Sequence, residues 1–126
     1  GRVYSTDVCL PISKITECVN YAEEQTKKFG LRAPMVGHVG DGNFHVLLPF
    51  DPKKKETYAK IREFNDLLIK KALKLNGTIT GEHGVGLHKK EYLLEQHPDN
   101  IPIMKSIKRT LDPNSIMNPG KIFDLN

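Results

Sequence analysis

The chain has 126 residues, with 19 Lys and Arg, 15 Asp and Glu and a formal net charge of +4. This length favours a single domain with a modest core, and no apolar run approaches the ~20 residues of a membrane-spanning helix. The basic residues are spread along predicted helices instead of gathering on one face, so the charge does not indicate a nucleic-acid-binding surface.

The first part of the chain predicts a strand, a helix and a hairpin. Apolar residues among short polar ones predict a strand over 2–10, which Pro11 ends. Apolar positions then recur every three or four residues up to Gly30, as in an amphipathic helix with glycine just after its end. A β-hairpin follows over about 35–50.

The second part predicts a long helix over about 52–75, a short strand over 78–80, and helical pieces over 89–96 and 100–111. The order is therefore β-α-β-β-α-β followed by a helical C-terminal extension. It predicts an α+β, ferredoxin-like fold, in which helices cover one face of an antiparallel sheet and leave the other free for a ligand or a partner domain.

The hairpin carries two histidines. An Asp41-Gly42 loop between apolar strands predicts that His38 lies directly opposite His45. Such pairs have Cβ atoms about 4.5–5.5 Å apart, and two nitrogens on one tetrahedral metal are roughly 3.3 Å apart, so the pair suits a metal. The alternative is two histidines that bond to each other on a solvated face. Asn43 shares the histidine face, and the residues expected on the core face are Val39, Phe44, Val46 and Leu48.

A second cluster lies in the glycine-rich segment Thr80–Gly86. Glu82 would complete a His-His-carboxylate set with an open coordination position, which is typical of catalytic metals. His83 is then expected beside the metal, where it could take a proton. The alternative is a polar loop with both side chains in solvent.

Four segments resemble one family. Thr6–Ser13, Gly37–His45, Thr80–Gly86 and Leu111–Lys121 resemble the C-terminal substrate domain of the FAD-linked 2-hydroxyacid dehydrogenases. That family includes cytochrome-linked D-lactate dehydrogenase, the glycolate oxidase flavoprotein subunit and D-2-hydroxyglutarate dehydrogenase. We therefore expect residues 1–126 to be the C-terminal part of the substrate (cap) domain, with the flavin-binding domain absent from this chain.

The resemblance implies a role for five residues. His38, His45 and Glu82 would hold a divalent metal, with zinc or manganese as the best candidates, and His83 would be the catalytic base. Asn118 would contribute to cofactor binding. FAD, bound by the missing domain, would accept a hydride from a small D-2-hydroxy acid whose hydroxyl the metal polarises, so the fragment alone is expected to be inactive.

Two positions bear on the substrate. Hydroxyglutarate-type members carry Lys near Ser5 and Asn near Leu47, polar groups that suit a second carboxylate. The short Ser5 and apolar Leu47 favour D-lactate. D-2-hydroxyglutarate and glycolate dehydrogenases of the same family are the alternatives.

The expected partners are the N-terminal FAD domain of the same protein, the 2-hydroxy acid, and an electron acceptor such as cytochrome c, a quinone or a flavoprotein. No nucleic acid and no membrane insertion are expected. The location would be mitochondrial in a eukaryote and cytoplasmic otherwise.

Three alternatives come from other functional classes. An RRM-like nucleic-acid-binding module shares the element order, but only Tyr4 offers a stacking ring on the first strand, and Phe44 lies on the core face. A metal hydrolase would use Glu82 or His83 as the base. A metal-free structural domain is the third.

Overall fold

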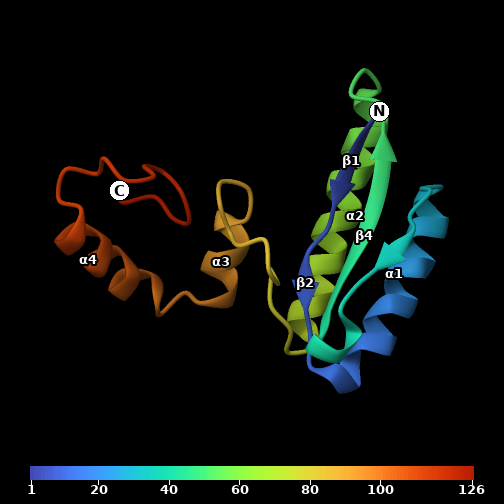
Figure 1. The fold of residues 1–126 in the computed structure, drawn as a ribbon, viewed down its shortest axis with the longest axis horizontal. Coiled ribbons are helices and arrows are strands. Elements are labelled where there is room, and N and C mark those ends of the chain that lie inside the picture. The colour runs from blue at the N-terminus through green and yellow to red at the C-terminus, as the bar shows by residue number, and fades with distance from the viewer. The chain divides into compact units, whose positions relative to one another are not determined.

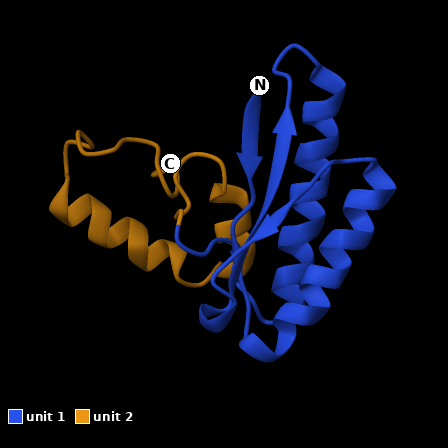
Figure 2. Cartoon of the chain, turned by 45° about the vertical axis from the view of Figure 1, so that its right-hand side comes forward, with its two compact units in different colours: residues 1–82 blue, residues 83–126 orange.

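The computed structural model describes all 126 residues and divides into two compact units (Figures 1 and 2). Unit 1 comprises Gly1–Glu82 and contains the whole sheet and two long helices. Unit 2 comprises His83–Asn126 and contains two shorter helices joined by extended loops. None of the helices combines the length and the apolar character needed to cross a bilayer.

The sheet of unit 1 is antiparallel and centred on β4 (Asn43–Phe50). The strand expected over 2–10 is interrupted at its middle, but both of its parts pair with β4 in one continuous register. Ser5 lies opposite Leu47, and Val8 lies opposite Phe44. The other strands are β1 (Arg2–Ser5), β2 (Val8–Cys9) and β3 (Met35–Val36).

The fourth strand of the expected fold is reduced to a single bridge. Thr78 forms an isolated antiparallel bridge with Cys9, and its N–H donates to the Cys9 carbonyl over 2.7 Å. The segment around Thr78, the β1–β2 strand, β4 and β3 therefore follow one another across the sheet. This arrangement confirms the α+β class, although a regular strand over 78–80 does not form.

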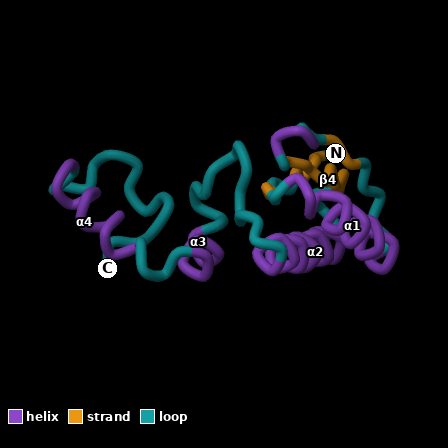
Figure 3. Tube along the Cα trace, turned by 90° about the horizontal axis from the view of Figure 1, so that it is seen from below, coloured by secondary structure: helices purple, strands orange, loops and turns teal.

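Helices cover one face of this sheet (Figure 3). α1 (Ile15–Phe29) follows a 3-10 turn (Ile12–Lys14) and ends at Gly30, which has a φ of +63°. α2 (Lys55–Lys74) follows β4. The predicted stripes of both helices pack on one side of β4, so burial of apolar surface holds this unit together. The core includes Val8, Cys18, Ala22, Phe44, Val46, Leu48, Ile61, Phe64, Leu68, Ile69 and Ala72.

Unit 2 contains α3 (Lys90–Gln96) and α4 (Ile101–Leu111), followed by turns up to Asn126. Pro102 lies in the first turn of α4, where a missing N–H costs nothing. At the other end of α4, the Asp112 carboxylate accepts hydrogen bonds from the N–H groups of Ile116 and Met117. These bonds fold the chain back after the helix.

Candidate functional site

Thr6, at the break between β1 and β2, is the first residue of the candidate site. Its side-chain hydroxyl, and not its carbonyl, accepts the sheet hydrogen bond from β4. The Val46 N–H donates to the Thr6 hydroxyl over 2.9 Å. The Thr6 carbonyl is left to accept a hydrogen bond from Nδ1 of His45 over 2.8 Å. His45 is buried on the sheet face opposite the helices, so this bond fixes the orientation of its ring.

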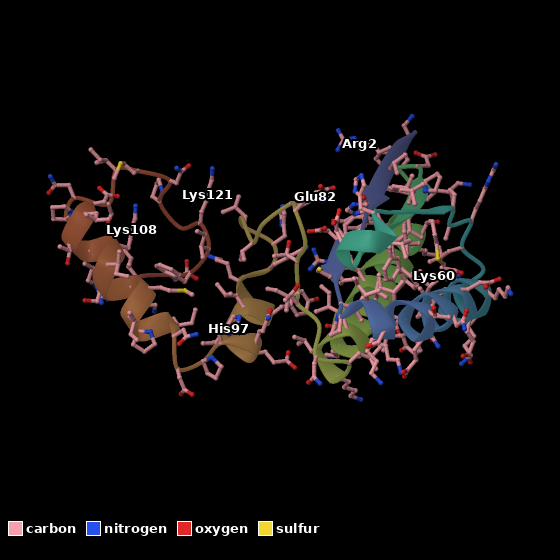
Figure 4. The ribbon with its side chains drawn as sticks, turned by 60° about the horizontal axis from the view of Figure 1, so that its bottom comes forward. Arg2, Lys60, Glu82, His97, Lys108 and Lys121 are labelled. Atoms are coloured by element: carbon pink, nitrogen blue, oxygen red, sulfur yellow. The ribbon has the colours of Figure 1, made fainter.

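The orientation of His45 determines what its other nitrogen meets. Because a carbonyl only accepts, Nδ1 carries a hydrogen and Nε2 of a neutral ring carries a lone pair. That Nε2 lies 3.1 Å from Oε1 of Glu82, the last residue of unit 1, labelled in Figure 4. Two acceptors face each other at this distance only if a proton or a cation joins them. The separation is close to the roughly 3.3 Å between two ligands of a tetrahedral ion.

His38 reaches this region by a different register from the one predicted. Val36, and not His38, lies opposite His45, so the expected direct pairing of the two histidines is wrong. The loop is a 3-10 turn over Val39–Asp41 closed by Gly42, with an Asn43 N–H to His38 carbonyl bond of 3.3 Å.

The loop has a single left-handed residue, which explains the error. Gly42 has a φ of +79°, whereas the predicted two-residue turn needs a positive φ at Asp41 as well. The register moves by two residues, which leaves the alternation of side chains between the two sheet faces unchanged. It also leaves Val39 56% exposed, so the expectation that Val39 belongs to the core is wrong.

A hollow of about 430 Å³ in unit 1 brings His38 and Glu82 together. Asn43 also lines it; this residue is 7% exposed, and its Oδ1 is buried without a hydrogen-bond partner. An imidazole, a carboxylate and an unpaired amide oxygen in one hollow suit a polar ligand or a divalent ion. The hollow is lined by Cys9, His38, Asp41, Asn43, Thr78, Thr80, Gly81 and Glu82.

Asp7 also belongs to this region, although the sequence predicts no role for it. Its carboxylate is 1% exposed and accepts bonds from the Thr80 hydroxyl at 2.6 Å, the Gly81 N–H at 2.8 Å and the Glu82 N–H at 3.3 Å. The one signal in the sequence is an acidic residue inside a predicted strand, where aspartate is uncommon.

The sequence of residues 1–122 matches the sequence model of the family described as FAD linked oxidases, C-terminal domain. The chain belongs to this family. The resemblance stated from the four segments is thereby confirmed over nearly the whole length.

Curated relatives agree with this assignment. A probable mitochondrial D-lactate dehydrogenase of Danio rerio is 42% identical over 125 residues, which make up 98% of this chain and 25% of the relative. Glycolate oxidase subunit GlcD of Bacillus subtilis is 36% identical over 118 residues, 93% of this chain and 25% of the relative. D-2-hydroxyglutarate dehydrogenase of Stutzerimonas stutzeri is 46% identical over 90 residues, 69% of this chain and 19% of the relative.

The chain thus spans about a fifth to a quarter of the length of these relatives. None of the three names describes a hydrolase or a nucleic-acid-binding protein. The metal-hydrolase and RRM-like alternatives therefore find no support in this family.

Two further residues that the sequence singled out belong to unit 2 of this FAD-oxidase C-terminal domain. His83 is its first residue and is exposed; its role as the base stays a prediction. Asn118 accepts a hydrogen bond over 3.1 Å from the ammonium of Lys121, which is labelled in Figure 4, in a turn after α4. Asn118, Lys121 and Lys108 line a cavity of about 580 Å³ within unit 2, and cofactor binding by Asn118 also stays a prediction.

Proposed function

We propose that the protein to which this domain belongs oxidises a small D-2-hydroxy acid, D-lactate in the first place, to the 2-keto acid. The observation that carries the proposal is the His45 Nε2 to Glu82 Oε1 approach of 3.1 Å, beside a hollow that His38 and Glu82 share. It occurs in a chain of the FAD-linked oxidase family, some of whose members are named for D-lactate, glycolate or D-2-hydroxyglutarate.

In this proposal, His38, His45 and Glu82 hold a divalent cation, zinc or manganese. Two imidazoles and one carboxylate are a ligand set that leaves a position open for substrate. The bound ion would supply Lewis-acid polarisation of the substrate hydroxyl. Thr6 contributes by presenting Nε2 of His45 through its carbonyl, which explains why a buried imidazole can be ready to bind without rearrangement.

His83 is the proposed base. It follows Glu82 directly in the chain, and an exposed imidazole is suited to exchange its proton with solvent after each turnover. In the reaction, the hydroxyl proton passes to His83, and the C2–H bond breaks with its electron pair to give the carbonyl. FAD, bound by a domain outside this chain, would supply the two-electron acceptor for that hydride.

The preference for a monocarboxylate rests on Ser5 and Leu47. These residues are direct cross-strand neighbours, and Leu47 lies two positions after His45, on the same sheet face. A short hydroxyl beside an apolar side chain gives a second carboxylate no cationic partner, and an unpaired carboxylate is costly to desolvate. This pair supports lactate over D-2-hydroxyglutarate; glycolate remains the second candidate.

Transient kinetics of the intact, flavin-loaded protein test this function. Anaerobic mixing with D-lactate should bleach the flavin, and D-2-hydroxyglutarate should do so much more slowly. His83→Ala should slow this bleaching about 10²- to 10⁴-fold while bound metal stays unchanged, since a base contributes about that much. His97→Ala, in the loop before α4, is the matched control. Equal bleaching rates in His83→Ala and the parent protein would remove the base assignment.

The ligand set needs its own variants. Glu82→Gln and His38→Ala should lose both bound metal and flavin reduction. Retention of stoichiometric metal in both variants would contradict the assignment.

We also propose a location and an electron acceptor. The location is mitochondrial if the source is eukaryotic, as for the Danio rerio relative, and the electrons pass to a cytochrome, quinone or flavoprotein acceptor.

A further inference from the structure

A buried carboxylate on one strand holds the segment that carries Glu82. Asp7 lies between β1 and β2, whereas Thr80–Glu82 lies 73 to 75 residues later in the chain. Three consecutive residues of that segment each donate to Asp7, one through a hydroxyl and two through the main chain. The segment forms no regular strand, so the sheet ladder does not position it.

We propose that Asp7 is a positioning residue that fixes the main chain of Thr80–Glu82, so that the Glu82 carboxylate meets Nε2 of His45. Glu82 is bound at its own N–H, and Gly81 at the residue before it. The Glu82 side chain is about half exposed, so packing alone does not hold it. The anchored backbone restricts where this flexible side chain can reach.

Both oxygens of Asp7 accept hydrogen bonds, so the contact requires a carboxylate at this position. Oδ2 accepts from the Thr80 hydroxyl and the Gly81 N–H, and Oδ1 accepts from the Glu82 N–H. Bonds to an ionised acceptor are about twice as strong as neutral ones, and a buried carboxylate must be bonded to remain charged. An amide in its place would turn a donor toward an N–H in either orientation.

Gly81 has a matching role in this contact. A Cβ on Gly81 would lie 2.7 Å from Oδ1 of Asp7 and 2.8 Å from both amide atoms of Asn43. Its φ is not positive, so glycine is required here for close approach and not for an unusual backbone conformation. The absence of a side chain at Gly81 thus admits the Asp7 carboxylate.

Hydrogen exchange of the metal-free protein tests the contact by itself. In Asp7→Asn, amides of peptides covering residues 78–84 should exchange about tenfold faster, as expected for the loss of a charge-assisted bond. Asp51→Asn is the matched control, because Asp51 accepts one exposed N–H, from Lys53, to which an amide oxygen can turn. Unchanged exchange at 78–84 in Asp7→Asn would overturn the inference.

The zinc affinity of the intact protein tests whether the Asp7 contact positions Glu82 for metal binding. It is measured by competition with a chromophoric chelator. This part rests on the metal site of the proposed function. Asp7→Asn and Gly81→Ala should each weaken zinc binding about 10- to 100-fold, the usual effect of losing a residue that orients a ligand. Gly40→Ala, whose Cβ would meet nothing within 4 Å, is the control for Gly81→Ala. Thr80→Ser should keep the parent affinity and Thr80→Val should lower it.

The outcomes separate the two proposals. Parent protein that binds zinc, with equal affinity in Asp7→Asn and Gly81→Ala, would overturn the role of Asp7 and leave the function standing. Parent protein that binds neither zinc nor manganese would overturn the metal site and, with it, the positioning of a ligand by Asp7. Faster exchange at 78–84 together with weakened zinc binding supports the inference.

Discussion

Each unit contains a buried aspartate that binds main-chain N–H groups, but the two differ in how far along the sequence their hydrogen-bond donors lie. Asp112 in unit 2 bonds to N–H groups four and five residues ahead and to the Lys108 ammonium one turn back. Asp7 in unit 1 bonds to a segment more than 70 residues away. The first closes a helix end and is local; the second joins distant parts of a fold and depends on the sheet around it.

The surroundings of the two residues differ in the same way. Unit 1 has a core of fully buried side chains from both helices and β4. In unit 2, Leu93 and Ile101 are the buried apolar residues, whereas Ile103, Ile107 and Leu111 are exposed at four-residue intervals along α4. Packing around Asp7 can therefore maintain its long-range polar contact, whereas the long-range contacts of unit 2, such as the Lys90–Asp124 ion pair, lie on its surface.

The largest expected difference between the units comes from removing an apolar side chain. Phe64→Ala in α2 should lower the free energy of unfolding of unit 1 by about 3–5 kcal/mol, because it leaves a cavity in a close-packed core. Ile107→Ala on α4 should lower the free energy of unfolding of unit 2 by less than about 0.5 kcal/mol, because the side chain is 55% exposed. Urea denaturation followed by hydrogen exchange of α2 peptides for unit 1 and of α4 peptides for unit 2 measures both, and equal losses would contradict the comparison.

Glycine substitutions give a smaller contrast. Gly42→Ala and Gly84→Ala both force alanine into a left-handed conformation, at about 1–2 kcal/mol. At Gly42, the new Cβ would also lie 2.2 Å from the Leu10 carbonyl oxygen, which adds about 1–3 kcal/mol of overpacking. At Gly84, nothing lies within 4 Å. Denaturation midpoints of the two variants should therefore differ, and similar midpoints would show that the hairpin loop can relax.

The smallest effect is a pH dependence confined to unit 2. The Lys108 ammonium, with the N–H groups of Met117 and Ile116, holds the pKa of Asp112 below its ordinary value of 3.8. A lowered folded-state pKa means that the stabilisation is complete above pH 4 and is lost as the pH falls through the folded pKa.

Hydrogen exchange after α4, followed as the pH is lowered below 4, measures this dependence. Asp112→Asn should remove the acid-induced opening and show the faster exchange at neutral pH as well. An unaltered pH profile in Asp112→Asn would assign the acid sensitivity to another group.

Much of unit 1 could be predicted because its elements are amphipathic. The stripes of α1 and α2 and the alternation of Phe44, Val46 and Leu48 follow from burial of one face, and the structure confirms them. The hairpin register could not be obtained in this way. A two-residue loop over 41–42 and the observed four-residue loop over 39–42 place the same β4 side chains on the core face, and the choice between them depends on whether Asp41 takes a positive φ.

The candidate site was predictable in part, because imidazole and carboxylate side chains are typical metal ligands. Residues with strong ligand chemistry, His45 and Glu82, were identified, and they lie 3.1 Å apart. Asp7 and Thr6 were missed as contributors because their roles depend on partners far away in the sequence, and one sequence does not reveal which distant segments meet. The strand predicted over 78–80 is reduced to the bridge at Thr78, and directly after this segment the N–H groups of Gly81 and Glu82 bond to the Asp7 side chain instead of to a neighbouring strand.

The exchange of roles at Thr6 has a consequence for the affinity of any ligand that His45 binds. A flexible imidazole loses rotational freedom when it first meets its ligand, which weakens binding. Here a hydroxyl substitutes for a peptide carbonyl in the sheet, and the released carbonyl aims the ring of His45 from the moment the strands pair. The ring thus loses its rotational freedom when the protein folds and not when a ligand binds. A ligand would therefore meet a nitrogen that is already in place.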